Sequence, residues 1–200
     1  MFNFREDWFS TNIPNWMTIF NTIGWNADEI KCAVEIGSFE GRSSVWILQN
    51  LLKNDRSKLH CIDTFEGGQE YSPDQLDGLY DRFNSNIRAT GNLHKVVIHK
   101  KKSFEALVEL NHGKCLADFI YVDGSHESQD VIADLILSFN MLRPGGLMIC
   151  DDYIWSIAGD ISHDLAQSPK FGIDCFTNIY HKNIKIIRGQ SLYQLAFTKV

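Results

Sequence analysis

The sequence predicts an α/β fold with a mostly parallel, doubly wound sheet that ends in an antiparallel hairpin. Short apolar runs alternate with longer segments of helical period, which is typical of a parallel sheet covered by helices on both faces. The last part differs, because strand-like runs at 184–188 and 192–198 flank the turn 189–191, which predicts a β-hairpin. The length of 200 residues and the 44% hydrophobic content suit one domain over residues 1–200.

The elements follow from local patterns along the chain. Apolar runs predict strands at 32–36, 59–63, 96–99, 118–122 and 147–150. One-sided apolar spacing predicts amphipathic helices at 43–52 and 131–141, and residues suited to helix starts open two further helices at 73–87 and 103–110. Residues 1–30 are rich in aromatic side chains, so we expect them to cap the domain as a lid or to form a homo-oligomer contact.

Composition narrows the class of partner and the compartment. The net charge of −6 and the isoelectric point of about 5.6 argue against a nucleic-acid partner, because such proteins usually carry a basic face. Five cysteines without a Cys-x-x-Cys pair fit a reducing compartment. The sequence shows neither a signal peptide nor an apolar run long enough for a membrane span, so we expect a soluble, cytoplasmic protein without membrane contact.

A strand, a glycine-bearing turn and a helix start follow one another at residues 34–44. Gly37 frees the backbone at the strand end, Gly41 removes a side chain from the turn, and Ser43 or Ser44 can cap the next helix. This arrangement predicts a nucleotide-like ligand at the turn. Phe39 stands where a dinucleotide fingerprint needs its middle glycine, which favours an adenosine-like ligand without a pyrophosphate.

This segment resembles motif I of the class I S-adenosylmethionine-dependent methyltransferases, and the resemblance extends from about residue 32 to 200. The strand 59–63 ends in Asp63, the stretch 117–126 ends in Asp-Gly-Ser-His, and the stretch 142–153 ends in Asp-Asp-Tyr. The last two motifs are similar to those of metal-dependent sugar O-methyltransferases. The resemblance implies a Rossmann-like sheet of seven strands in the order 3-2-1-4-5-7-6.

The resemblance also implies an S-adenosylmethionine site at the carboxyl ends of the strands. Asp63 would accept the ribose hydroxyls, Glu35 would order the cofactor loop or only bond nearby backbone, and Ser103 would either cap a helix or contact adenine. The expected cofactor-binding residues are Glu35, Gly37, Ser38, Gly41, Ser43, Asp63, Ser103 and Asp123.

Three carboxylates are expected to meet beside this site. Asp123, Asp151 and Asp152 follow the fourth and fifth strands, and oxygen ligands of this kind suit Mg²⁺. By resemblance, Asp123 would be both metal ligand and general base. His126 is the rival base, because an imidazole can accept the proton without a metal.

These residues predict an enzyme that transfers a methyl group from S-adenosylmethionine to an oxygen of a small acceptor, with Mg²⁺. A sugar hydroxyl is the first choice of acceptor and a phenol the second, recognised by the N-terminal aromatics and by segments 65–80 and 153–171. Three alternatives stay open: a metal-independent methyltransferase that uses His126, a nicotinamide-dependent (NAD) oxidoreductase, and a non-catalytic cofactor-binding subunit.

Overall fold

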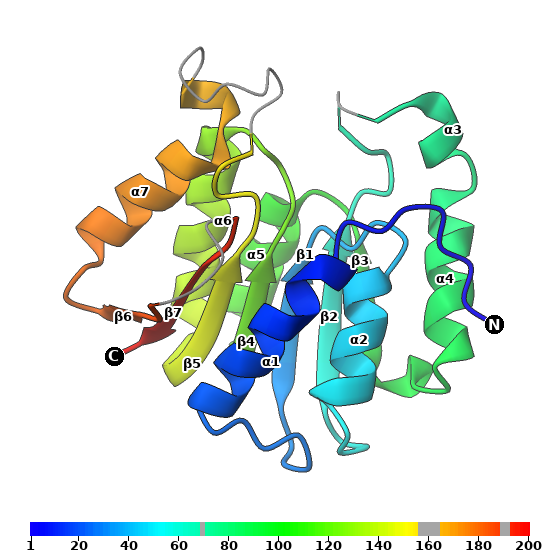
Figure 1. Cartoon of the computed structure of the whole chain (residues 1–200), viewed down its shortest axis with the longest axis horizontal. Coiled ribbons are helices and arrows are strands. Elements are labelled where there is room, and N and C mark those ends of the chain that lie inside the picture. The colour runs from blue at the N-terminus through cyan, green and yellow to red at the C-terminus, as the bar shows by residue number, and fades with distance from the viewer. Residues whose placement is uncertain (69–70, 156–164, 189–192) are drawn as a thin grey trace.

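A computed structural model of the chain describes residues 1–68, 71–155, 165–188 and 193–200. Within them, seven strands form one sheet in the order β3-β2-β1-β4-β5-β7-β6 (Figure 1). The pairs among β1 to β5 are parallel, whereas β7 pairs with β5 and β6 in antiparallel fashion. The strands are β1 (Cys32–Ile36), β2 (Lys58–Asp63), β3 (Val96–Lys100), β4 (Ala117–Val122), β5 (Leu142–Cys150), β6 (Ile184–Ile186) and β7 (Leu195–Lys199).

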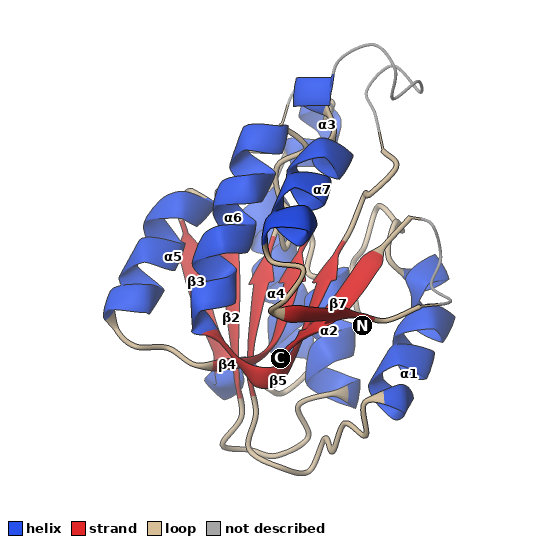
Figure 2. Ribbon diagram, turned by 90° about the vertical axis from the view of Figure 1, so that its left-hand side faces the viewer, coloured by secondary structure: helices blue, strands red, loops and turns tan. Residues whose placement is uncertain are grey.

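Helices cover both faces of the sheet (Figure 2). One face carries α1 (Ile13–Thr22), α2 (Arg42–Asn50) and α4 (Leu79–Ala89), and the other carries α5 (Ser103–His112), α6 (Ser128–Met141) and α7 (Pro169–Ile179). The short helix α3 (Pro73–Leu76) precedes α4.

Each face of the sheet has its own hydrophobic core. Along β4, Phe119 and Tyr121 pack into the core under α1 and α2, while Ile120 and Val122 pack into the core under α5 and α6. This split follows from the two-residue period of a strand, and it explains why β4 has apolar or aromatic side chains at each position from 119 to 122.

The predicted strand order and the antiparallel ending are confirmed. The single helix expected at 73–87 is wrong, because Gly78 adopts φ = 63° and separates α3 from α4. Strand β6 is shorter than expected and β7 begins only at Leu195. The tight turn expected at 189–191 lies outside the described residues.

The N-terminal aromatic segment packs on the domain. Trp16 of α1 is fully buried, and its ring meets the ring of Tyr121 edge-on at a centroid distance of 4.7 Å. Its indole Nε1 donates to Oε1 of Gln194 at 3.0 Å. Helix α1 therefore joins the centre of the sheet to the start of β7, and its role as a lid stays a prediction.

In the described part of the chain, no helix combines the length and the apolar character that crossing a membrane requires.

Candidate active site

A cavity of about 950 Å³ opens at the carboxyl ends of the parallel strands. The connections after β1, β2, β3, β4 and β5 all contribute to its wall, as does the N-terminal segment between Glu6 and Asn12. This is where an open α/β sheet presents loops to a ligand. Of the expected cofactor residues, the cavity is lined by Gly37, Ser38, Ser43, Asp63, Ser103 and Asp123, whereas Glu35 and Gly41 lie behind the wall.

Glu35 organises the turn after β1 from below. Its side chain is fully buried, and its Oε2 accepts hydrogen bonds from the hydroxyls of Ser38, at 2.8 Å, and Ser44. Burial raises the pKa of Glu35, while the hydroxyls of Ser44, Ser43 and Ser38 oppose that rise. The expected capping of helix α2 by a serine is wrong, because the N-cap is Gly41 and these hydroxyls serve Glu35.

The two glycines of the turn are required by neighbouring parts of the chain. A Cβ on Gly37 would lie 1.8 Å from the backbone oxygen of Asp123, and a Cβ on Gly41 would lie 2.9 Å from the ring of Phe83. Both glycines also have φ near +80°, which side chains disfavour. Gly37 thus lets the β1 loop touch the β4 loop, a reason independent of any ligand.

Asp63 ties the loop after β2 to the turn after β1. Its Oδ2 accepts the backbone N–H groups of Ser38 and Phe39, both at 2.8 Å, and its Oδ1 accepts that of Phe65 at 2.7 Å. A carboxylate has about four acceptor positions, so about one is left for a hydroxyl in the cavity. Asp63 therefore shapes the site and can still bind a ligand.

Ser103 does not cap helix α5, so that expectation is wrong. The N-cap is Lys102 and no side chain bonds there. Ser103 instead hydrogen bonds to Asp134 of α6, whose pKa is raised to about 7 by burial despite this bond. Ser103 also lines the cavity, where it can meet a ligand.

Asp123 and Asp151 lie side by side and share one phenol. The hydroxyl of Tyr121 lies 2.9 Å from Oδ2 of Asp123 and also bonds Oδ2 of Asp151. The same oxygen of Asp151 accepts hydrogen bonds from Nε2 of Gln194 at 2.7 Å and from Nδ2 of Asn12 at 3.3 Å. The side chain of Asp151 is therefore held by a residue of β4, by one just before β7 and by one of the N-terminal segment.

The two carboxyl groups resist losing their protons together. Burial, followed by the charges of Asp151 and Asp152, raises the pKa of Asp123 well above its usual value. Burial and the charge of Asp152 raise the pKa of Asp151 to about 6. Like charges this close favour a retained proton or a bound cation.

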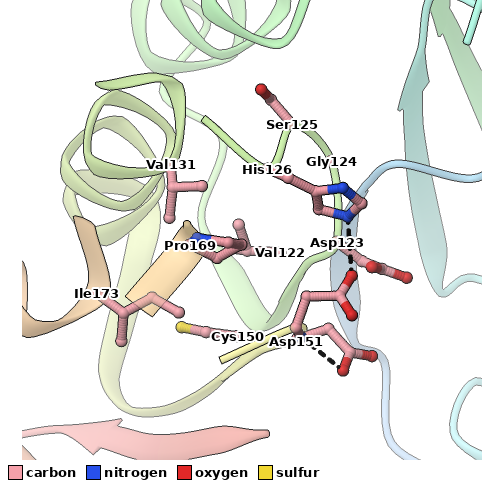
Figure 3. Close-up of a pocket in the computed structure, with 11 residues that line it drawn as sticks. Val122, Asp123, Gly124, Ser125, His126, Val131, Cys150, Asp151, Pro169 and Ile173 are labelled. Atoms are coloured by element: carbon pink, nitrogen blue, oxygen red, sulfur yellow. Dashed lines mark hydrogen bonds and ion pairs between the residues drawn. The ribbon is translucent and has the colours of Figure 1, made fainter. Parts of the chain in front are cut away.

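His126 lies within hydrogen-bond distance of the next carboxylate. Its Nε2 lies 2.9 Å from Oδ2 of Asp152, and its ring centroid lies 3.9 Å from that of Trp155. Figure 3 shows His126 on the loop after β4, close to Asp123 and Asp151. Asp152 has φ = 55°, a left-handed backbone that non-glycine residues adopt mostly where the surroundings impose it, often at functional sites.

The aspartates suit a hard cation by their chemistry, because clustered carboxylates with raised pKa values gain from a positive charge between them. The possible ligand atoms of the three aspartates, however, lie farther apart than those of another group of side chains. In the described ranges, the group of three candidate ligands whose atoms all lie within 4.8 Å of one another is Cys32, His60 and Cys115, and not the aspartates. A cation would therefore draw the carboxylates of Asp123, Asp151 and Asp152 closer together.

An aromatic wall lines the cavity, and two of its three residues lie in segments expected from the sequence to recognise the acceptor. The rings of Phe39 and Tyr71 stack at a centroid distance of 5.2 Å, and Trp8 contacts them at 5.1 Å and 5.8 Å. All three residues line the cavity. The sequence marks Phe39 only as a missing glycine, and the spacing from Trp8 to Tyr71 gives no signal of this contact.

A buried ion pair that holds the N-terminal segment is likewise absent from the sequence-based expectations. Nε of Arg82 lies 2.7 Å from Oε1 of Glu40, and both side chains are almost fully buried. The other carboxylate oxygen of Glu40 accepts the backbone N–H groups of Arg5 at 2.8 Å and Glu6 at 3.2 Å. Glu40 thus fixes the segment that closes one side of the cavity.

The sheet order, the turn after β1 and the acidic strand ends define the class I S-adenosylmethionine-dependent methyltransferase fold. Residues 34–153, more than half of the chain, match the family model described as a methyltransferase domain. The chain belongs to this family. The expected class of enzyme is thereby confirmed at the level of family, which favours it over the NAD-dependent alternative.

Proteins similar to this chain come from a virus and from a bacterium. An uncharacterised protein, R132, of Acanthamoeba polyphaga mimivirus is 29% identical over 120 residues, which are 60% of this chain and 50% of that protein. The match therefore spans half the length of that curated relative. An O-methyltransferase from Bacillus cereus, solved with S-adenosylhomocysteine, is similar with a TM-score of 0.61 at 16% identity, covering 95% of this chain and 91% of that one.

A further similar structure is CalS11, a TDP-rhamnose 3'-O-methyltransferase of calicheamicin biosynthesis. Its TM-score is 0.61 at 14% identity, and the match covers 94% of this chain and 79% of that one. At these identities the two solved structures establish the shared fold.

Proposed function

We propose that this protein transfers the methyl group of S-adenosylmethionine to a hydroxyl oxygen of a small acceptor, with Mg²⁺ as the assisting ion. The observation that carries the proposal is the partly buried acidic cluster of Asp123, Asp151 and Asp152 at the cavity of a methyltransferase fold. Such a cluster can accept a proton from an acceptor hydroxyl beside the cofactor.

The cofactor site of the proposal follows the cavity wall. Asp63 binds the ribose through the acceptor position that its three backbone hydrogen bonds leave, and the adenine lies toward Ser103. Gly37 lets the turn after β1 lie against the backbone of Asp123, which any side chain at position 37 would meet. Asp123, Asp151 and Asp152, which follow β4 and β5, would line the part of the cavity where the methyl group is transferred.

The chemistry requires an activated oxygen, because an alcohol is a poor nucleophile until it loses its proton. Burial and the charges of Asp151 and Asp152 favour the protonated form of Asp123, and a cation among these carboxylates would favour the ionised form that can accept the proton. Tyr121 and Gln194 keep Asp151 in place beside it. Asp123, Asp151 and Asp152 would hold Mg²⁺, whose positive charge would lower the pKa of the acceptor hydroxyl and help to orient it.

The acceptor in this proposal is a small molecule, with a sugar hydroxyl as first choice and a phenol as second. The similar TDP-rhamnose 3'-O-methyltransferase supports the first choice. The cavity wall adds Trp8, Tyr71 and Trp155, whose rings suit the apolar face of either kind of acceptor. The formal charge of −6 argues against a nucleic-acid acceptor, and the five free cysteines support a cytoplasmic place of action.

A second candidate mechanism uses His126 as the base without a metal. The 2.9 Å contact with Asp152 favours it, because a carboxylate orients the imidazole and stabilises its charged form.

The test combines cofactor binding with chelation. Calorimetry should detect S-adenosylhomocysteine but not NAD, with or without Mg²⁺. Methyl transfer to a panel of sugar and phenol acceptors should vanish in excess chelator and in Asp123→Asn, while Asp55→Asn, at an 89% exposed side chain, serves as the matched control. Full activity in excess chelator, with loss in His126→Gln, would replace the metal mechanism by the histidine mechanism.

A further inference from the structure

A second group of metal-binding side chains lies on the α5 side of the sheet. Cys32 opens β1, His60 lies in β2, and Cys115 precedes β4. Their candidate ligand atoms all lie within 4.8 Å of one another, and each residue is half-buried. Cys32 is five residues before Gly37, which places it about 16 Å from the cavity along an extended strand.

The sulfur atoms already have the spacing of a metal site. Sγ of Cys32 and Sγ of Cys115 are 3.9 Å apart. Two thiolates on a tetrahedral zinc ion, each bonded at about 2.3 Å, lie roughly 3.8 Å apart. A disulfide would require about 2.05 Å, so the observed separation matches shared coordination much more closely.

His60 is held in a suitable orientation by a second histidine. Its Nδ1 lies 3.0 Å from Nε2 of His99 on β3, so Nε2 of His60 remains available to bind an ion. Histidines that bind metals usually use their other ring nitrogen in this way, and that contact fixes the ring and its tautomer.

The backbone of Cys32 is held in place as well, because its N–H donates to Oδ2 of Asp118 at 2.7 Å.

We propose that Cys32, His60 and Cys115 form a zinc site that is separate from the catalytic cavity, with His99 supporting His60 and water at the fourth position. Two thiolates and an imidazole select a soft or borderline ion such as Zn²⁺ over Mg²⁺. The ion would join β1, β2 and the connection between α5 and β4, so its role is to stabilise this part of the sheet.

The test uses Co²⁺ as a spectroscopic probe for Zn²⁺ on full-length, reduced and chelator-treated protein. We expect one Co²⁺ per chain, a thiolate-to-cobalt charge-transfer band and the intense visible bands of a tetrahedral ion, all displaced by Zn²⁺. Cys115→Ser and His60→Ala should lose this binding. His99→Ala should weaken it by roughly 10- to 100-fold.

Two controls distinguish this site from a lone thiol and from the aspartate cluster. Cys175→Ser, which changes another half-buried free cysteine on α7, should bind Co²⁺ like the wild type. Asp152→Asn should also keep the site, because the aspartate cluster does not supply its ligands. Zn²⁺ should raise the melting temperature of the wild type but not that of Cys115→Ser, whose affinity for S-adenosylhomocysteine reports that it is folded.

The proposal is overturned if the wild type gives no charge-transfer band after reduction, or if folded Cys115→Ser binds Co²⁺ as tightly as the wild type. It is equally overturned if Cys115→Ser does not fold and His60→Ala, tested in its place, keeps the band unchanged.

Discussion

Buried carboxyl groups at single positions set the pH response of this protein. Asp134 is 2% exposed, and its pKa of about 7 lies above the ordinary value of 3.8. The folded protein therefore holds a proton that the unfolded chain releases between these values. Stability from this group is fully present below about pH 4 and is lost as the pH rises toward 7.

Asp134→Asn should remove that pH dependence, because the amide keeps the shape of the side chain without a titrating proton. Between about pH 4 and 7, the free energy of unfolding of the wild type should fall relative to that of the variant by at most about 1.4 kcal/mol per pH unit. Urea unfolding across this range measures the difference, with Asp55→Asn as control. Parallel curves for the wild type and Asp134→Asn would contradict the assignment.

Asp63 offers a second test at the scale of one residue. Asp63→Ala removes the acceptor of the Ser38, Phe39 and Phe65 N–H groups as well as the proposed ribose contact. Affinity for S-adenosylhomocysteine should weaken by roughly 1 to 3 kcal/mol. Calorimetry measures this, and an unchanged dissociation constant would remove Asp63 from the cofactor site.

Most polar residues of the site could be predicted because they follow strands. Asp63, Asp123 and Asp151 each stand at the end of an apolar run, so the parallel sheet itself brings them to one edge. The serine partners of Glu35 and the bond of Ser103 to Asp134 could not be predicted, because they depend on which neighbour each side chain meets in three dimensions. The mutual contact of Trp8, Phe39 and Tyr71 could not be predicted for the same reason.

At the scale of elements, the turn after β1 is limited by its contact with the β4 loop. Gly37→Ala would place a Cβ 1.8 Å from the oxygen of Asp123, whereas Gly91→Ala meets no atom within 4 Å. Both glycines have positive φ, at 82° and 74°. Gly91→Ala therefore measures only the cost of a side chain at positive φ, about 1 kcal/mol. Gly37→Ala adds the collision of the methyl group with Asp123.

We expect Gly37→Ala to lose several times more stability than Gly91→Ala in urea unfolding, because backbone atoms must move apart to admit the methyl group. The loss should be present without any cofactor, since the contact is between two parts of the chain. Equal losses in the two variants would show that the turn relaxes freely.

Element boundaries depart from the sequence prediction where backbone conformation or close packing decides. Gly78 interrupts a pattern that otherwise favours one helix over 73–87. Helix α7 is not among the helices expected from the sequence, and Gly172 lies inside it. In the structure a Cβ at Gly172 would lie 2.7 Å from the oxygen of Ser128, so the glycine permits α6 and α7 to pack closely.

At the scale of the whole molecule, the N-terminal segment closes one side of the cavity. Deletion of residues 1–7 removes the backbone groups of Arg5 and Glu6 that bond Glu40. We expect S-adenosylhomocysteine to dissociate several-fold faster, because Glu6 and Asp7 no longer line the cavity. Stopped-flow fluorescence measures the rate, and an unchanged rate in a variant that melts cooperatively would contradict the lid role.

The bond between Trp16 and Gln194 also bears on the order of folding, because it joins residues 178 positions apart. Closing so long a loop costs entropy that only an already formed sheet can offset. Helix α1 should therefore dock after the folding barrier, and Trp16→Phe should speed unfolding while leaving the folding rate nearly unchanged. A matching slowdown of folding would place this contact in the nucleus instead. If α1 docks late, the chain completes its sheet before it completes the wall of its cavity.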